Sequence, residues 1–469
     1  FAMAYFGLAF LSLEPDEAMQ KSALIKAWQL SDRVTEKERL SIHSLYASEI
    51  EKDLAKSVSL LEELIQKYPH EQRAYLGLGA SYAGQGNYEK ALAVYLRALE
   101  NDPRDGLAWN TLAYTNMMLN KRNEAMTAIG HYMQLSPALP NAYDSKGEIC
   151  CAFGDLDSAL YWYQKAVSFK TDFPTTYKIG LVSLIKQDYA TAEKEFRLWG
   201  STSDNLQKAS AENMLSIIPF HRGRLQESEL VLRRNLESSQ AQQLQGSVND
   251  IYFGLMLIAY QQHDYPALLD YAQKFSVELK KGPGSVIYGR DMLALAYLKN
   301  GNAAMYSKLI DDIRHDLHED DPNQKVIPEY TIAIGEFEKG NYGACLDHYQ
   351  KASQWLAPRH APLFPIAVSL LKTGRVAEAI EEFQRIAVWA PIDFPEFSLF
   401  FLPVLEDWPT AAVKARYWLG VAYEQQGEKN HAIKEYQEFL DIWKDADFKS
   451  PELQDAKMRV AKLKGMAVR

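Results

Sequence analysis

This sequence has few cysteines and no excess of basic residues over acidic ones. Three cysteines occur in 469 residues, and two of them, Cys150 and Cys151, are adjacent, so no disulfide framework is indicated and the redox compartment stays open. Lys and Arg number 51 against 61 Asp and Glu, for a formal net charge of -10. Because binding to a phosphate backbone requires clustered cations, this balance argues against a nucleic acid partner.

Long apolar runs are also lacking. The run FAMAYFGLAFLSL at residues 1–13 is too short to span a bilayer, and no basic leader of a signal peptide precedes it. We therefore predict a helix there and no membrane span in this chain. Since no Met opens the chain and Phe1 falls where a helix already starts, we expect a piece of a longer polypeptide.

What the chain does have is length and internal repetition. At 47% hydrophobic and 24% charged residues, a chain of 469 residues is too long for one core unless it is a stack of repeats. The stretch GNYEKALAVYLRALENDP at 86–103 returns as GNYGACLDHYQKAS at 340 and as GEKNHAIKEYQEFL at 427. One helix hairpin cannot bury its apolar face alone, and repeated hairpins cover one another.

The repeat spans 34 residues and predicts two amphipathic helices. Units that begin at Gly106 and Pro140 keep the order of large, small and apolar residues of the unit that begins at Gln72. In that unit the recurring positions are Tyr75, Leu78, Gly79, Tyr82, Ala91, Tyr95 and Ala98, with Pro103 at its end. The small residues Gly79 and Ala91 would let the two helices approach closely, and GQGN at 84–87 would form the turn between them.

The same register extends along the chain. Weaker units begin at Glu38 and Phe173, degenerate ones near 209, 250, 287 and 326, and better ones at His360 and Val413. If residues 1–37 are a degenerate first unit, the sequence predicts about twelve helix pairs, followed by a capping helix at 450–465. We therefore predict an all-α solenoid in three parts: 1–200, best formed at 72–172; degenerate units at 201–357; and 358–469. Strand-like alternation is absent.

This spacing of aromatic, Leu, Gly or Ala, Tyr, Ala and Pro resembles the tetratricopeptide repeat, which implies a right-handed superhelix that binds protein or peptide partners. LSDRVTEKERLSIHSLYA at 30–47 and YQEFLDIWKDADFKSPELQDAK at 436–457 resemble the repeat region of bacterial eukaryotic-like serine/threonine kinases. Similar regions follow winged-helix and cyclase domains. The resemblance implies a scaffold or sensor region fused to, or partnered with, a signalling domain. It favours a cytoplasmic location, or an extracytoplasmic one if the region follows a membrane-spanning kinase.

Candidate catalytic and metal sites are few. His315 and His318 could share a helix face as metal ligands, but the run DDIRHDLHEDD around them is uniformly polar and favours a solvated helix end. KGPGSVIYG at 281–289 lacks the phosphate-loop spacing, and the adjacent cysteines favour packed thiols over nucleophiles. No kinase motif occurs. We predict no catalytic residue, no cofactor and no metal; the alternative is an enzyme site hidden in the degenerate units at 209–357.

One segment breaks the periodicity, APIDFPEFSLFFLPVLEDWPT at 390–410. Its prolines preclude a long helix, and its aromatic side chains are too apolar to stay in water. Two interpretations are open: it covers the seam between the last two good units, or it forms a lid or docking surface beside a groove.

The resemblance also places a partner site. In such stacks the first helix of each unit lines the concave side, so residues one step round from its packing stripe face the groove. The candidates are Asn110, Tyr114, Met117, Asp144, Glu148 and Tyr177. Clamps that hold a C-terminal carboxylate use Lys, Arg and Asn in these slots, and only Asn110 fits. We therefore expect a groove for a partner helix or an extended segment with Tyr, Leu or Met anchors.

Overall fold

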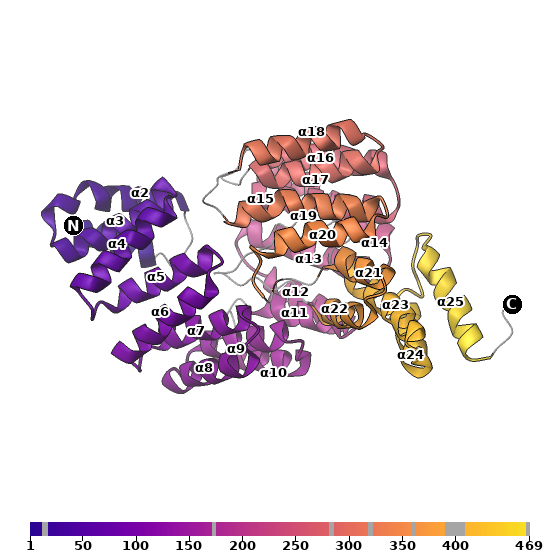
Figure 1. Cartoon of the computed structure of the whole chain (residues 1–469), viewed down its shortest axis with the longest axis horizontal. Helices are drawn as coiled ribbons and strands as arrows, with labels where there is room; N and C mark the ends of the chain where they lie inside the picture. Colours follow the sequence, from indigo (N-terminus) through magenta and orange to yellow (C-terminus); the bar gives the residue numbers. More distant parts are fainter. Residues whose placement is uncertain are drawn as a thin grey trace. The chain divides into compact units, whose positions relative to one another are not determined.

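The chain is helical throughout the part that its structure, a computed structural model, describes (Figure 1). That part comprises residues 1–11, 17–170, 175–280, 286–317, 322–358, 360, 363–389 and 409–465. It contains 25 α-helices and no strand, as the sequence predicts. The helices form two compact units, the first mainly Phe1–Pro137 and the second mainly Ala138–Leu356 and the residues after it.

The first unit contains four helix pairs. Their bounds are α1 Ala2–Leu11, α2 Glu17–Gln29, α3 Glu36–Tyr46, α4 Leu54–Lys67, α5 Gln72–Gly84, α6 Tyr88–Asn101, α7 Gly106–Met118 and α8 Arg122–Leu135. A π-helical turn at Ala47–Glu51 extends α3.

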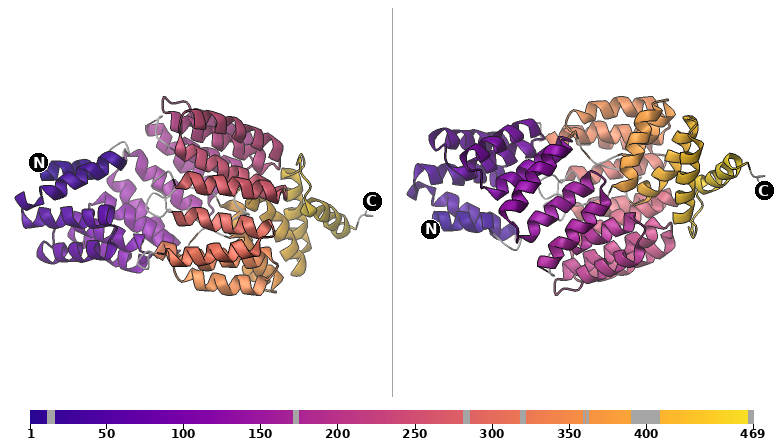
Figure 2. Two further views of the ribbon diagram at one scale, coloured as in Figure 1. Left: turned by 90° about the horizontal axis from the view of Figure 1, so that it is seen from above. Right: turned by 90° about the horizontal axis from the view of Figure 1, so that it is seen from below.

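The second unit contains eight further pairs and a last single helix among its described residues. The bounds are α9 Pro140–Ala152, α10 Leu156–Phe169, α11 Thr176–Ile185, α12 Tyr189–Trp199, α13 Asn205–His221, α14 Leu225–Ala241, α15 Gln245–Gln261, α16 Tyr265–Leu279, α17 Val286–Lys299, α18 Ala303–His315, α19 Pro322–Glu338, α20 Tyr342–Ser353, α21 Phe364–Lys372, α22 Val376–Val388, α23 Thr410–Gln425, α24 Lys429–Ile442 and α25 Pro451–Leu463. Figure 2 shows these helices packed in successive layers. The predicted pairs and the capping helix are confirmed, although α15 begins five residues before the predicted 250.

In the hairpins from α3 and α4 onward, the chain turns through a residue in the left-handed conformation, which we call the turn residue. Gly86, Gly154 and Gly301 have φ of 73°, 76° and 81°, a region that glycine enters without steric cost. Asn or Asp often follows and caps the second helix: the Asn87 side chain accepts from Lys90 N at 3.3 Å. The turn residue thus fixes the register of every pair.

Small residues in the first helices let the second helices approach, as predicted. A Cβ added to Gly79 would overlap the Tyr95 ring, with Cζ at 2.5 Å. A Cβ added to Gly420 would likewise overlap the ring of Tyr436. In both repeats the tyrosine lies sixteen residues after the glycine. The aromatic ring of the second helix therefore occupies the volume that a side chain on the first helix would need.

First and second helices differ in how they are buried. Every residue of α7 from Asn110 to Met118 is buried, and so is every residue of α21 from Phe364 to Leu371. The second helix α22 buries only one stripe, Ala379, Phe383, Ile386 and Ala387. The first helices α7 and α21 are thus buried around most of their circumference, whereas the second helix α22 has an open face.

The second unit also joins segments far apart in sequence. At the turn between α13 and α14, Arg224 occupies the N-cap position, where several other second helices have Asn or Asp, and it forms no side-chain cap. Asp447, just after α24, supplies the cap instead: its carboxylate accepts from Leu225 N at 2.8 Å and Gln226 N at 3.0 Å. The buried Trp443 donates from Nε1 to the His221 carbonyl oxygen at 3.0 Å. The end of α24 is therefore fixed to the start of α14.

Some expectations lie outside the described residues. Residues 390–408 of the aromatic segment, residues 281–285 of the glycine-rich stretch and His318 belong to these. The three-part division at 200 and 357 rests on how well the repeats keep their pattern, and the two compact units do not test it.

Candidate binding surface

The first group of candidate residues lies along α7 in the first unit. Asn110, Tyr114 and Met117 are 9%, 7% and 1% exposed. Their burial is what packing alone would produce, so a role for Tyr114 and Met117 in binding remains a prediction. Asn110 differs in one respect: its buried Oδ1 has no hydrogen-bond partner among the residues that the structure describes. An acceptor in that position can take a donor from a bound segment.

The second group, in the second unit, is an ion cluster that joins α9 to α11. Lys178 Nζ donates to Asp144 Oδ2 at 2.7 Å and also to Glu148 Oε1. The hydroxyl of Thr175 donates to Asp144 Oδ1 at 2.7 Å. All four side chains are buried. Burial alone would lower the pKa of Lys178, but the carboxylates of Glu148 and Asp144 outweigh it and raise the pKa, so the ammonium stays charged.

The sixth candidate, Tyr177, is half-buried on α11. Its ring lies 5.2 Å from the ring of Trp199, and Lys178 Nζ lies 5.9 Å from the Tyr177 ring centroid. The structure therefore places Asp144, Glu148 and Tyr177 around a single lysine. One ammonium thus pairs with two carboxylates.

Sequence reasoning missed Lys178. It lies 34 residues after Asp144, which is one repeat length, and this spacing puts the two residues on neighbouring first helices. A search for opposite charges one repeat apart would have found the pair. The two acidic candidates are thus tied into the packing of the repeats.

The cysteines and histidines offer little for catalysis. Cys150, Cys151 and Cys345 are all buried. Burial, with the nearby Glu148 carboxylate, raises the pKa of Cys151 to about 12, so it is a protonated thiol and a poor nucleophile at neutral pH. The packed-thiol interpretation is confirmed. His315 is the last residue of α18. No cluster of three or more His, Cys, Asp or Glu suited to a metal ion occurs in the described ranges.

Comparison with known proteins identifies the repeats. Residues 52–106 and 413–442 match models of the tetratricopeptide repeat. A TPR repeat-containing protein of Methanocaldococcus jannaschii is 34% identical over 87 residues, 18% of this chain and 15% of that protein. Human tetratricopeptide repeat protein 13 is 24% identical over 195 residues, 39% of this chain and 22% of that protein. The chain thus spans less than a quarter of each relative.

Among solved structures, MamA from Desulfovibrio magneticus RS-1 covers 35% of this chain and 93% of its own. It is 18% identical with a TM-score of 0.31.

The chain therefore contains tetratricopeptide repeats in an all-helical solenoid, a scaffold suited to binding proteins or peptides. The matched families are repeat families, which points to a non-catalytic scaffold. In the part of the chain that the structure covers, no helix has both the length and the apolar character needed to cross a membrane.

Proposed function

We propose that this chain is the partner-binding region of a bacterial signalling protein and holds a protein segment on the inner faces of its first helices. The repeat matches support the scaffold role. The phrases at 30–47 and 436–457, which resemble kinase-associated repeat regions, support the signalling context. The chain itself performs no catalysis in this proposal, and the signalling domain is a separate part or partner.

The observation that carries the proposal is the unpaired amide oxygen of Asn110. A buried acceptor without a donor costs free energy, on the order of 1–3 kcal/mol, unless a ligand supplies the donor. A backbone N–H of an extended segment is such a donor, and the Asn amide group can bind a peptide unit through both its oxygen and its nitrogen. Tyr114 and Met117 lie four and seven residues further along the same helix, where they would contact side chains of that segment.

The test uses the whole chain and peptides selected from a random displayed library. We expect selected peptides to bind with dissociation constants of micromolar order, and Asn110→Ala to weaken binding by about tenfold, which is ~1.4 kcal/mol. Asn123→Ala is the matched control, because Asn123 is exposed on the neighbouring second helix α8. Since Asn110 Oδ1 makes no hydrogen bond within the described structure, the melting temperature of Asn110→Ala should not fall. Equal affinity of wild type and Asn110→Ala would refute the proposal.

A further inference from the structure

Asp291, on α17 of the second unit, is a buried acid without a counter-charge. Its side chain is 1% exposed, and Oδ2 has no hydrogen-bond partner among the described residues. Oδ1 accepts a hydrogen bond from the backbone nitrogen of the next residue, Met292, at 2.5 Å, and the backbone of Asp291 itself also stabilises the carboxylate. No Lys, Arg or His in the described ranges forms an ion pair with it. A carboxyl group in this state is costly to bury.

The cations of the same helix are engaged elsewhere. Arg290 pairs with Asp316, which follows the end of α18. Lys299 Nζ lies 2.6 Å from Glu338 Oε2 on α19. Neither side chain can neutralise Asp291 without giving up its own partner.

The repeat register shows that packing does not require an acid here. Asp291 lies ten residues before the turn residue Gly301, as Asn110 lies ten before Asn120. In other repeats this position holds Leu76 or Phe364, which are simple apolar side chains. Where an acid does occur, at Asp144, it is paired with Thr175 and Lys178. Asp291 therefore occupies the same repeat position as Asp144 but has no cation or hydroxyl group paired with it among the described residues.

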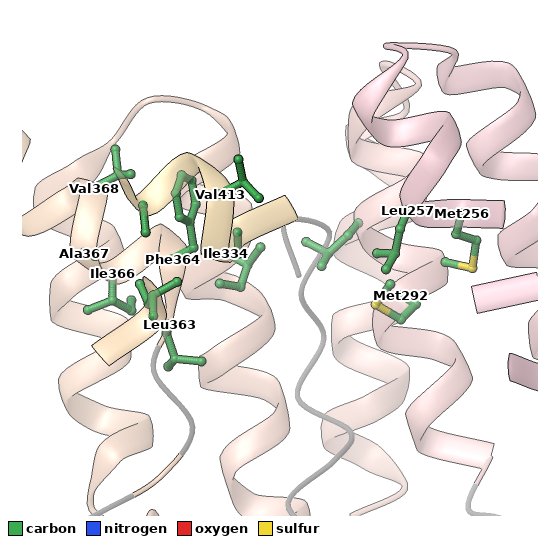
Figure 3. Packing of buried hydrophobic residues seen from close by; sticks show 14 of the residues in the cluster. Met256, Leu257, Met292, Ile334, Leu363, Phe364, Ile366, Ala367, Val368 and Val413 are labelled. Atoms are coloured by element: carbon green, nitrogen blue, oxygen red, sulfur yellow. The ribbon is translucent and has the colours of Figure 1, made fainter. Parts of the chain in front are cut away.

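The neighbouring first helices carry aromatic residues at the positions that match Asp291. On the neighbouring first helices α15 and α19, the matching positions, ten residues before the turn residues His263 and Gly340, hold Phe253 and Tyr330. Figure 3 shows the adjacent Met292 gathered with Met256 and Leu257 of α15, and all three are buried. Burial raises the pKa of Asp291 well above its ordinary value, which favours the neutral carboxylic acid over the carboxylate.

We infer that Asp291 is the recognition group of a second binding site, which accepts an ammonium or guanidinium group carried on an apolar chain. In a protein partner this is the side chain of a Lys or Arg flanked by aliphatic residues. When the cation enters, the carboxyl group releases its proton to solvent and an ion pair forms in a low-dielectric environment, where such a pair is strong if its geometry is good. The inference goes beyond the proposed function, because the site lies in the second unit and does not involve Asn110.

The probe is n-hexylammonium, with hexan-1-ol as the neutral control of similar length. Isothermal titration calorimetry on the full chain should show that hexylammonium binds at least about tenfold more tightly than hexan-1-ol, because a hydrogen bond between charged groups is stronger than one between neutral groups. Titration in two buffers of different ionisation enthalpy should show up to about one proton released for each hexylammonium bound. A merely structural role for Asp291 predicts neither result.

Variants separate the site from general apolar binding. Asp291→Leu should bind hexylammonium and hexan-1-ol about equally. It should melt no lower than wild type, because the substitution removes an unpaired buried polar group. Asp291→Asn, which keeps the shape, should lose the proton release as well. The control Asp270→Asn changes a half-exposed carboxylate of α16 that pairs with Lys274, and it should leave the preference unchanged.

Three results would overturn the inference: no binding of hexylammonium, equal binding of the amine and the alcohol, or a preference that survives in both Asp291 variants. Asn110→Ala should retain the preference in full. A negative result in the hexylammonium experiment therefore does not affect the proposed function. A negative result in the peptide-binding experiment with Asn110→Ala does not affect this inference.

Discussion

A single glycine sets the spacing of a helix pair at residue 79. Gly79→Leu should destabilise the chain by about 1–3 kcal/mol, because the new side chain must displace the Tyr95 ring that already contacts the glycine. Gly130→Leu on α8 is the control, since nothing lies within 4 Å of a Cβ added there. Thermal and urea unfolding would measure both. An unchanged midpoint for Gly79→Leu would mean that this repeat register is incorrect.

A second residue, Lys178, pairs with two buried acids. Lys178→Met should cost about 3–5 kcal/mol, because it leaves Asp144 and Glu148 buried without their cation. Lys194→Met should change stability by no more than about 0.5 kcal/mol, as Lys194 is 75% exposed beside Glu195. Adding Asp144→Asn and Glu148→Gln to Lys178→Met should recover part of the loss. If the triple variant is no more stable than Lys178→Met, the loss has another origin.

A third residue, His221, gives a prediction for pH. Burial first, and then Arg416 and Arg222, lowers the pKa of His221 from 6.5 to about 3. Its ring also faces the Tyr189 hydroxyl at 3.3 Å. Below pH ~6.5, His221 therefore binds a proton in the unfolded chain but stays neutral in the folded chain. The free energy of unfolding should fall with decreasing pH by up to ~1.4 kcal/mol per unit from this residue.

Comparison with a variant isolates that contribution. In His221→Gln the free energy of unfolding, measured by urea unfolding at each pH, should fall less steeply between pH 6 and pH 4 than in wild type. This range lies inside the window from 6.5 to about 3 that the pKa of His221 sets. His70→Gln, at an exposed histidine of the first unit, should leave the slope as it is. If the free energy of unfolding changes with pH equally in wild type and His221→Gln, His221 is not buried as a neutral ring.

At the scale of the element, helix α14 depends on a cap from outside its own repeat. Asp447→Ala should cost about 0.5–2 kcal/mol, because two backbone N–H groups at the start of α14 lose their acceptor. Asp441→Ala removes an exposed carboxylate near the end of α24 and should have little effect. Hydrogen exchange at Leu225 and Gln226 should quicken only in Asp447→Ala. Exchange that stays slow there would contradict the capping role.

The two kinds of helix also differ in how far sequence could predict them. Second helices such as α22 bury one stripe, so helical periodicity marks both their existence and their buried face. First helices such as α7 are buried on every side, which removes the contrast between faces on which such a prediction depends. Groove positions could therefore be assigned only from the repeat register. That register placed Asn110 and Asp144 on first helices but could not show that both would be buried.

At the scale of the whole molecule, the repeat pattern predicts contacts between neighbours only. It therefore predicted the helix pairs and their order, but not the cap that Asp447 places on α14 across more than two hundred residues. No signal in the sequence marked it, because Arg224 lacks a side-chain cap just as Lys121, Arg375 and Glu428 do at the start of other second helices. The partner of Asp144 and the isolation of Asp291 likewise depend on packing between repeats, which composition does not reveal.

Hydrogen exchange of the full chain with and without a selected peptide tests most directly whether the inner faces of the first helices bind a partner. Saturating peptide should slow exchange in the first helices, most strongly in α7 at Gly106–Met118, because the ligand hydrogen-bonds Asn110 and holds that helix closed. Exchange in the second helix α8 should change less. Slowing confined to second helices, or no slowing at all with peptide bound, would contradict a partner site on the first helices.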